Sequence, residues 1–94
     1  MSILTLVDSI QLVKEEVRNS KELKPVGLVS NLCAINLQAK KDSGSSEEIS
    51  TLICESVSWL IANPENRVAI LAPINKALEI LKAEFNPSSV RGSK

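Results

Sequence analysis

Hydrophobic residues in the first quarter of the chain recur at spacings of three and four positions. Successive residues of an α-helix are rotated by about 100°, so this spacing places them along one side of a helix. The pattern predicts an amphipathic helix from Ser2 to about Leu23, ended by Pro25, because the residue before a proline disfavours helical dihedral angles. The apolar stripe consists of Ile3, Leu6, Ile10, Val13 and Val17.

The next segment is apolar on almost every side of a helix, and no charged residue occurs between Lys24 and Lys40. One face carries four apolar residues, and a second face beside it carries three. These are Leu28, Leu32, Ile35 and Ala39 on the first face, and Val29, Cys33 and Leu37 on the second. A membrane span needs about 20 apolar residues. The shorter segment, interrupted by polar residues, predicts a buried helix from about Val26 to Lys41.

A loop rich in serine precedes a third pattern of apolar residues. Ser45, followed three residues later by Glu48, matches a capping box and predicts the start of a helix. The stripe of this helix consists of Ile49, Leu52, Ile53, Val57 and Leu60. Cys54 and Ile61 fall on one flank of the stripe and Trp59 on the other.

The fourth pattern begins at Asn63 and Pro64, which favour the cap and the first position of a helix. It extends to about Phe85. Pro73 lies inside this pattern and lacks the amide hydrogen for the helical bond, which predicts a kink or a break. Residues 88–94 offer little to bury, and we expect them to be a disordered tail. The stripe consists of Leu71, Ile74, Leu78, Leu81 and Phe85.

Together these patterns predict an all-α protein, an antiparallel up-and-down bundle of four helices. Two amphipathic outer helices would cover two largely apolar inner helices. The length of 94 residues favours a single domain over residues 1–87. Short connections between helices support this topology.

Composition excludes several classes of function. Eleven basic and eleven acidic side chains give zero net charge, so no global field attracts nucleic acid or an anionic membrane. The chain contains no histidine, the commonest general base and metal ligand. Its three glycines form no phosphate-binding motif. We therefore expect no catalytic residues, no metal, no cofactor and no small-molecule substrate.

The amino terminus lacks the basic segment of a signal peptide, which favours a cytoplasmic location. Cys33 and Cys54 lie far apart in the sequence on predicted helices. In a reducing compartment we expect both to be buried thiols that pack like small hydrophobic residues.

The apolar surface of the two inner helices exceeds what two outer helices can cover. We therefore expect a protein–protein interaction: self-association into a homo-oligomer such as a dimer, the binding and regulation of a larger partner, or both. The candidate partner-binding residues are Val29, Cys33, Leu37 and Trp59. The alternative for each of them is ordinary core packing.

A second hypothesis is a nucleic-acid-associated accessory protein. Lys14, Arg18 and Lys21 share one face of the first predicted helix and could contact phosphate groups. The alternative is that these side chains border the apolar stripe and keep the surface hydrated. The first hypothesis, protein–protein interaction, is favoured because the chain is neutral and poor in aromatic residues.

Overall fold

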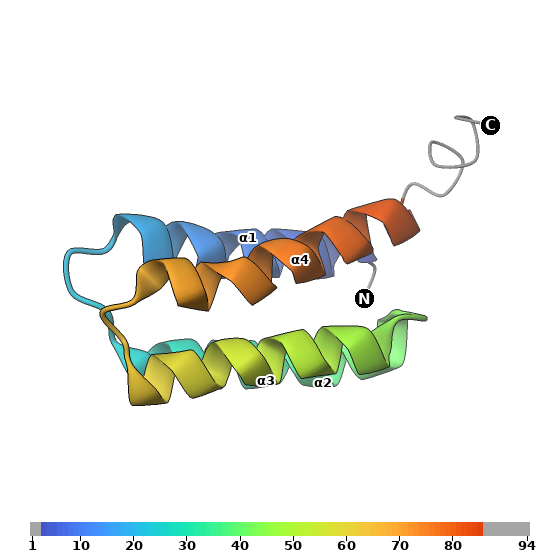
Figure 1. Ribbon diagram of the computed structural model, residues 1–94. Coiled ribbons are helices and arrows are strands. Elements are labelled where there is room, and N and C mark those ends of the chain that lie inside the picture. The colour runs from blue at the N-terminus through green and yellow to red at the C-terminus, as the bar shows by residue number, and fades with distance from the viewer. Residues whose placement is uncertain (1–2, 86–94) are drawn as a thin grey trace.

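The computed structural model describes the backbone of residues 3–85 and the side chains of residues 5–84. This part of the chain forms four helices joined by short connections (Figure 1). Each helix runs antiparallel to the next one along the chain. The predicted four-helix bundle is thereby confirmed. The predicted tail, residues 88–94, lies outside the described residues. The helices are α1 (Ile3–Asn19), α2 (Pro25–Asp42), α3 (Ser46–Ala62) and α4 (Arg67–Phe85).

The four helices form a ring in which each packs against two neighbours. Helix α1 contacts α2 and α4, and α3 contacts the same two helices. The expected division into inner and outer helices is therefore wrong. Connections of a few residues join helices that lie next to each other, and each of the four helices buries one side in the common core. As a consequence, α1 and α4 leave one side of α2 and of α3 open.

The core contains one stripe from every helix. The described members of the stripe predicted for α1 are buried, with exposed fractions of 3% or less. The four α2 residues predicted on the first face, Leu28, Leu32, Ile35 and Ala39, are buried as well. Ile49, Ile53 and Leu60 of α3 and Ile70, Ile74, Ala77, Leu78 and Leu81 of α4 complete the core. Three-and-four spacing thus identified most of the buried side of each helix. The predicted stripe members Leu52, Val57 and Leu71 are only half-buried, because they lie at the edges of their stripes. The core residues Ile70 and Ala77 were not in the stripe predicted for the fourth helix.

The carboxyl end of α1 differs from the prediction. The helix ends at Asn19, not at Leu23, and Pro25 is the first residue of α2. Arg67 of α4 explains this end, because its guanidinium group donates hydrogen bonds to three backbone carbonyls of the preceding turn and loop. The acceptors are the carbonyl oxygens of Val17, at 2.9 Å, Ser20, and Lys21, at 3.0 Å. A side chain from α4 thus takes the place of continued helical hydrogen bonds.

The start of α3 also uses a group from α4. Ser45 occupies the predicted cap position, but its side chain makes no capping hydrogen bond, so the predicted capping box is wrong. Glu84 instead holds the loop. Its carboxylate accepts a hydrogen bond from the Ser43 hydroxyl at 2.7 Å and one from the Gly44 amide at 2.6 Å. Arg67, at the start of α4, therefore holds the end of α1 and the loop that follows it, and Glu84, near the end of α4, holds the loop before α3.

The start of α4 lies three residues later than predicted. Asn63 ends α3 and does not begin α4. The cap of α4 is Asn66, whose side-chain oxygen accepts a hydrogen bond from the Ala69 amide at 3.2 Å. Residues 63–66 are needed to reverse the chain direction, and the amide of Asn66 bonds the carbonyl of Asn63 at 3.0 Å. From Arg67 the helix continues through Pro73 without a break.

One buried polar side chain was not anticipated. Ser56 of α3 is fully buried, and its hydroxyl donates a hydrogen bond to the Ile70 carbonyl of α4 at 2.8 Å. The small side chain allows α3 and α4 to approach closely, and the hydrogen bond satisfies its polar group. In the part of the chain that the structure describes, no helix is long and apolar enough to cross a membrane.

Candidate functional site

The grooves between the helices define which side of α2 and α3 is open. Lys40 of α2 and Cys54 of α3 line the groove between these two helices. Asn31 and Ala34 of α2 line a groove with α1 instead. Leu52 of α3 lines a groove with Ile80 of α4. Because each residue adds a rotation of about 100°, these positions fix the orientation of both helices.

We call the side of α2 and α3 that points away from α1 and α4 the α2–α3 face. It is the lower side of the bundle in Figure 1. Most of its residues are apolar or carry a small uncharged side chain. On α2 they are Val26, Val29, Ser30, Cys33, Leu37 and Lys40, and on α3 they are Glu47, Ser50, Cys54, Val57, Ser58 and Ile61.

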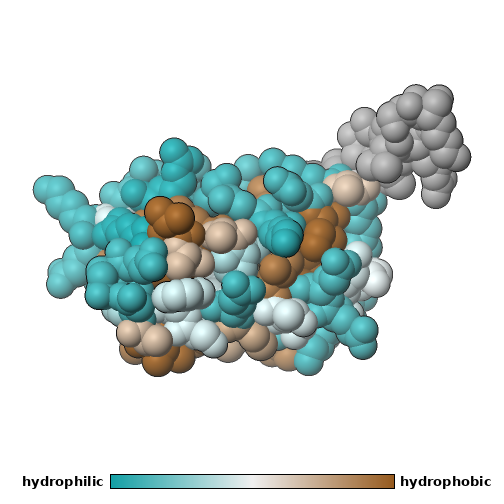
Figure 2. Space-filling model, viewed as in Figure 1, coloured by the Kyte–Doolittle hydropathy of each residue, from teal (hydrophilic) through white to brown (hydrophobic). Residues whose placement is uncertain are grey.

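Large hydrophobic side chains on this face are open to solvent. The exposed fraction is 85% for Val26, 63% for Leu37 and 68% for Ile61. Val29 is half-buried and packs against the core from the groove. Along the lower edge of the bundle in Figure 2, brown and tan atoms gather at the left end. The face therefore contains apolar surface that the bundle does not cover.

Both thiols are exposed on the α2–α3 face, which corrects the expectation that they are buried. Cys33 and Cys54 are free and solvent-exposed. Each lies on the flank of its helix that turns outward, next to the buried stripe and not within it. The apolar residues around each cysteine in the sequence suggested burial, but neighbouring helices approach from other directions.

Three of the four predicted partner-binding residues share the α2–α3 face, and Trp59 does not. Val29, Cys33 and Leu37 follow one another along α2 at spacings of four. Trp59 lies five residues after Cys54, a rotation of about 140° around α3. It lies seven residues, about two turns, after Leu52, so it lies on the flank of α3 toward α4. There it is half-buried and packs against the core.

Sequence reasoning did not assign Val26, Cys54 or Ile61 to the candidate surface. The signal was present, because Cys54, Val57 and Ile61 follow the same three-and-four spacing as the α2 residues. It could not be used without knowing that the outward flanks of α2 and α3 lie side by side.

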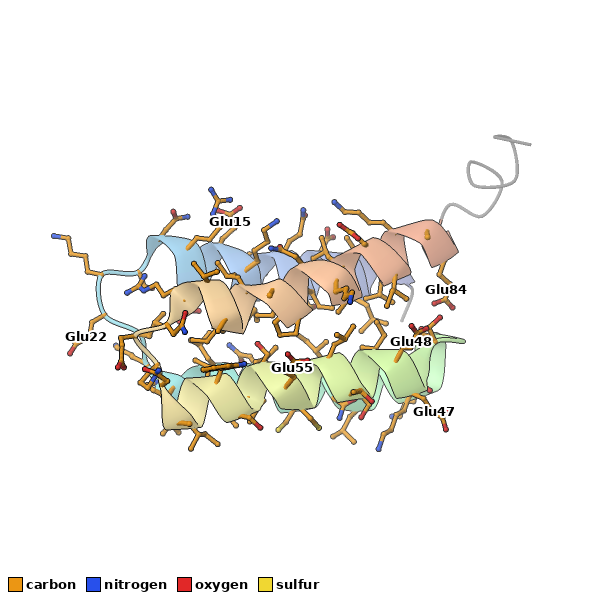
Figure 3. All side chains as sticks on the ribbon, in the orientation of Figure 1. Glu15, Glu22, Glu47, Glu48, Glu55 and Glu84 are labelled. Atoms are coloured by element: carbon orange, nitrogen blue, oxygen red, sulfur yellow. The ribbon has the colours of Figure 1, made fainter. Side chains whose placement is uncertain are left out.

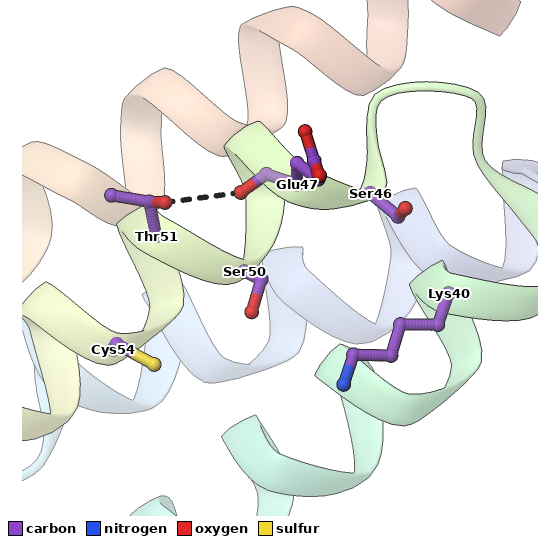
Figure 4. Close-up of a pocket in the computed structure, with 6 residues that line it drawn as sticks. All are labelled: Lys40, Ser46, Glu47, Ser50, Thr51 and Cys54. Carbon is purple, nitrogen blue, oxygen red and sulfur yellow. Dashed lines mark hydrogen bonds between the residues drawn. The ribbon is translucent and has the colours of Figure 1, made fainter.

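One end of the α2–α3 face is hollowed, as the close-up in Figure 4 shows. The hollow has a volume of about 580 Å³ and is open to solvent. Its lining includes an ammonium, a carboxylate, hydroxyls and a thiol, but one hydroxyl is already used. The Thr51 side chain donates a hydrogen bond to the Glu47 backbone carbonyl at 3.1 Å. The lining residues are Lys40, Ser46, Glu47, Ser50, Thr51 and Cys54.

Charge is confined to this end of the face. Lys40 and Glu47 line the same hollow from the two helices and have opposite signs. Beyond them, no charged residue lies on the α2–α3 face as far as Val26 and Ile61 at its other end. The labelled side chains in Figure 3 place Glu47 on the lower side of α3, whereas Glu48 and Glu55 do not point down. The centre of the face is therefore electrically neutral.

The basic residues of the second hypothesis lie elsewhere on the bundle. Arg18 and Lys21 are exposed, and Lys14 is half-buried on α1. Acidic side chains, among them the exposed Glu15 and Glu22, lie between and beside them. Lys40 and Lys41, at the carboxyl end of antiparallel α2, lie at the opposite end of the bundle and do not extend this cluster.

No group of three or more potential metal ligands comes together among the described residues. No family model, curated protein or solved structure matches this chain. The proposed function therefore depends on the surface chemistry of the bundle itself.

Proposed function

We propose that this protein is not an enzyme and acts through protein–protein interaction at the α2–α3 face. The observation that carries the proposal is the exposure of Val26, Leu37 and Ile61 on one face with an uncharged centre. Contiguous exposed apolar surface on small proteins marks interaction sites, because leaving it in water has no structural benefit. A regulatory or adaptor role fits such a small bundle.

The energetic support comes from transfer of apolar area out of water. Burial of a leucine or valine side chain contributes about 1.5–3 kcal/mol. Leu37 and Ile61 retain about two thirds of their surface exposed, so most of this contribution is still available to an interaction. Because α2 and α3 are already helical and packed in the bundle, binding would order little backbone. This preorganisation favours affinity.

Trp59 is outside the proposed surface. Tryptophan is common at binding hot spots, which made it a candidate from the sequence. Its half-buried ring packs against the core on the other flank of α3, and core packing accounts for it. The proposal therefore depends on Val29, Cys33 and Leu37 of the original set.

A cytoplasmic location is part of the proposal. Two free and exposed thiols, Cys33 and Cys54, are compatible with a reducing compartment. In an oxidising compartment, exposed thiols are prone to form unselective disulfides.

The experiment that tests the proposal is site-specific photo-crosslinking in the native host. A photoreactive amino acid replaces Leu37 in one variant and Leu12 in the matched control. These two leucines have similar exposed fractions, 63% and 71%, but Leu12 is on α1 and lines the groove between α1 and α2. We expect protein adducts from position 37 at a yield well above position 12. The absence of adducts at position 37, or equal yields at both positions, would contradict the proposal.

A further inference from the structure

We infer that the α2–α3 face binds a second copy of this chain, so that the protein is a two-fold symmetric dimer of bundles. The inference rests on the proposed function and specifies the partner. In a two-fold dimer the same surface is used by both subunits, and it must therefore be complementary to itself. The charge pattern of this face meets that requirement, the size of the face approaches that of a standard interface, and its two thiols lie at its centre.

The face approaches the size that a stable dimer needs. Helices of 18 and 17 residues are about 27 Å long, and two helices side by side are about 20 Å wide. The projected area is therefore roughly 500 Å², and the accessible area of projecting side chains is larger. Stable complexes bury about 800 Å² per partner. One helix-pair face thus approaches the size of a standard interface without further elements.

The charge pattern also favours a second copy. A neutral face offers no charge for a strongly acidic or basic partner, but two neutral faces can meet without repulsion. The two charges at one end, Lys40 and Glu47, have opposite signs and lie on different helices. If α2 of one copy packs on α3 of the other, each Lys40 lies opposite Glu47 of the second copy. If α2 packed on α2, Lys40 would lie over the apolar end at Val26, which is unfavourable. We therefore place α2 on α3.

The thiols mark the centre of the proposed interface. Cys33 is the ninth of 18 residues in α2, and Cys54 is the ninth of 17 residues in α3. Because the helices are antiparallel and joined by a short loop, the two positions lie at the same level. A two-fold axis through the centre of the face places the centre of one copy opposite the centre of the other. In the arrangement with α2 on α3, Cys33 of one copy lies opposite Cys54 of the other.

The first test measures the dimer dissociation constant of the purified 94-residue chain by sedimentation equilibrium under reducing conditions. Leu37→Asp is expected to raise it about a hundredfold, because symmetry places two aspartates in one interface and each costs about tenfold. Leu12→Asp is the matched control and should leave it unchanged. Val26→Asp and Val68→Asp form a second pair, each at the second position of a helix with 85% and 80% exposure. Only Val26→Asp should weaken the dimer.

The second test uses a short bismaleimide cross-linker, to which thiols add without an oxidant. Cys33→Ser and Cys54→Ser are prepared separately and then mixed in equal amounts. Neither variant can form an intramolecular bridge. We expect the mixture to give far more covalent dimer than either variant alone, because Cys33 of one chain meets Cys54 of the other. Efficient cross-linking within each separate variant, and none gained on mixing, would overturn the proposed packing of α2 on α3.

The outcomes separate this inference from the proposed function. A chain that stays monomeric at high concentration overturns the dimer, and so does a dimer weakened equally by Leu37→Asp and Leu12→Asp. If photo-crosslinking from position 37 then yields an adduct with a different protein, the proposed function stands and only the identity of the partner is wrong. If position 37 yields no protein adduct, both fail. An adduct of twice the chain mass supports both.

Discussion

The two opposite sides of this bundle enclose the same core but present different chemistry to their surroundings. The α2–α3 face is neutral at its centre, whereas the face formed by α1 and α4 is mostly polar and charged, with Val68 as an exposed apolar residue near one end. We call the latter the α1–α4 face, and in Figure 2 it forms the mostly teal upper edge. Its exposed residues are Asp8, Gln11, Glu15 and Arg18 of α1, and Val68, Asn75, Glu79 and Lys82 of α4.

The difference indicates that folding of the bundle does not require the exposed apolar residues of the α2–α3 face. Each helix buries its stripe in the common core, and the α1–α4 face shows that the outer side of a helix pair in this bundle can consist mostly of polar and charged residues. Leu37 and Ile61 would therefore be replaceable by polar residues if folding were their only role. This contrast is the basis for assigning binding to one face and solvation to the other.

The largest expected effect tests whether α2 is divided into a buried and an open side. Leu32→Ala should lower the free energy of unfolding by about 3 kcal/mol, because Leu32 is 1% exposed and the change leaves a cavity. Leu37→Ala, five residues later on the same helix, should change it by less than about 0.5 kcal/mol. Urea denaturation at protein concentrations that keep the chain monomeric measures both. Equal losses would mean that Leu37 belongs to the core and that the α2–α3 face is not open.

The next largest expected change in stability comes from Arg67, which links α4 to the end of α1. Arg67→Ala should destabilise the bundle by about 2 kcal/mol, because three backbone carbonyls lose their charged hydrogen-bond donor. Arg18→Ala, on the outer surface of α1, should have an effect within about 0.5 kcal/mol. Thermal and urea denaturation of the two variants provide the comparison. A loss at Arg18 as large as at Arg67 would show that the charged face has a structural role.

Glu84 connects the two helix pairs, and its contribution should be smaller. Glu84→Gln keeps the shape of the side chain but weakens its hydrogen bonds to Ser43 and Gly44, at an expected cost of about 1 kcal/mol. Glu79→Gln, on the exposed surface of the same helix, is the control. Hydrogen exchange of the amides in residues 43–46 should increase in the Glu84 variant alone. Unchanged exchange would mean that Glu84 does not hold this loop.

The smallest expected change in stability comes from Ser56, which lies in the contact between α3 and α4. Ser56→Ala should cost about 0.5–1 kcal/mol, since one buried hydrogen bond to the Ile70 carbonyl is lost while the packing is kept. Ser58→Ala, two residues later and exposed, should be neutral or slightly stabilising, because alanine favours helix. Urea denaturation distinguishes them. A stabilising Ser56→Ala would show that this hydroxyl is not a net contributor to the contact between α3 and α4.

A nucleic-acid binding assay tests whether function belongs to the basic residues of α1 and not to the α2–α3 face. If binding belongs to the α2–α3 face, fluorescence anisotropy at low salt should show no binding of duplex DNA or single-stranded RNA. Replacing both Lys14 and Arg18 with glutamate should then change nothing. Binding that these substitutions abolish would transfer the function to the basic residues of α1.

The sequence by itself determined the four helices, their approximate bounds and the stripe that each helix buries. These features depend on local spacing, and three-and-four periodicity is a property of one helix. Leu28, Leu32, Ile35 and Ala39 could be assigned to the core for this reason. The up-and-down topology followed from short connections.

Only the tertiary structure decided which of the remaining apolar residues stay in water and which polar groups hold the ends. The carboxyl end of α1 depends on Arg67, some fifty residues away in the chain, and the loop before α3 depends on Glu84. Likewise, exposure of Cys33 and separation of Trp59 from Leu37 depend on where neighbouring helices lie. Burial is a property of several elements together, so the pattern within one helix cannot specify it.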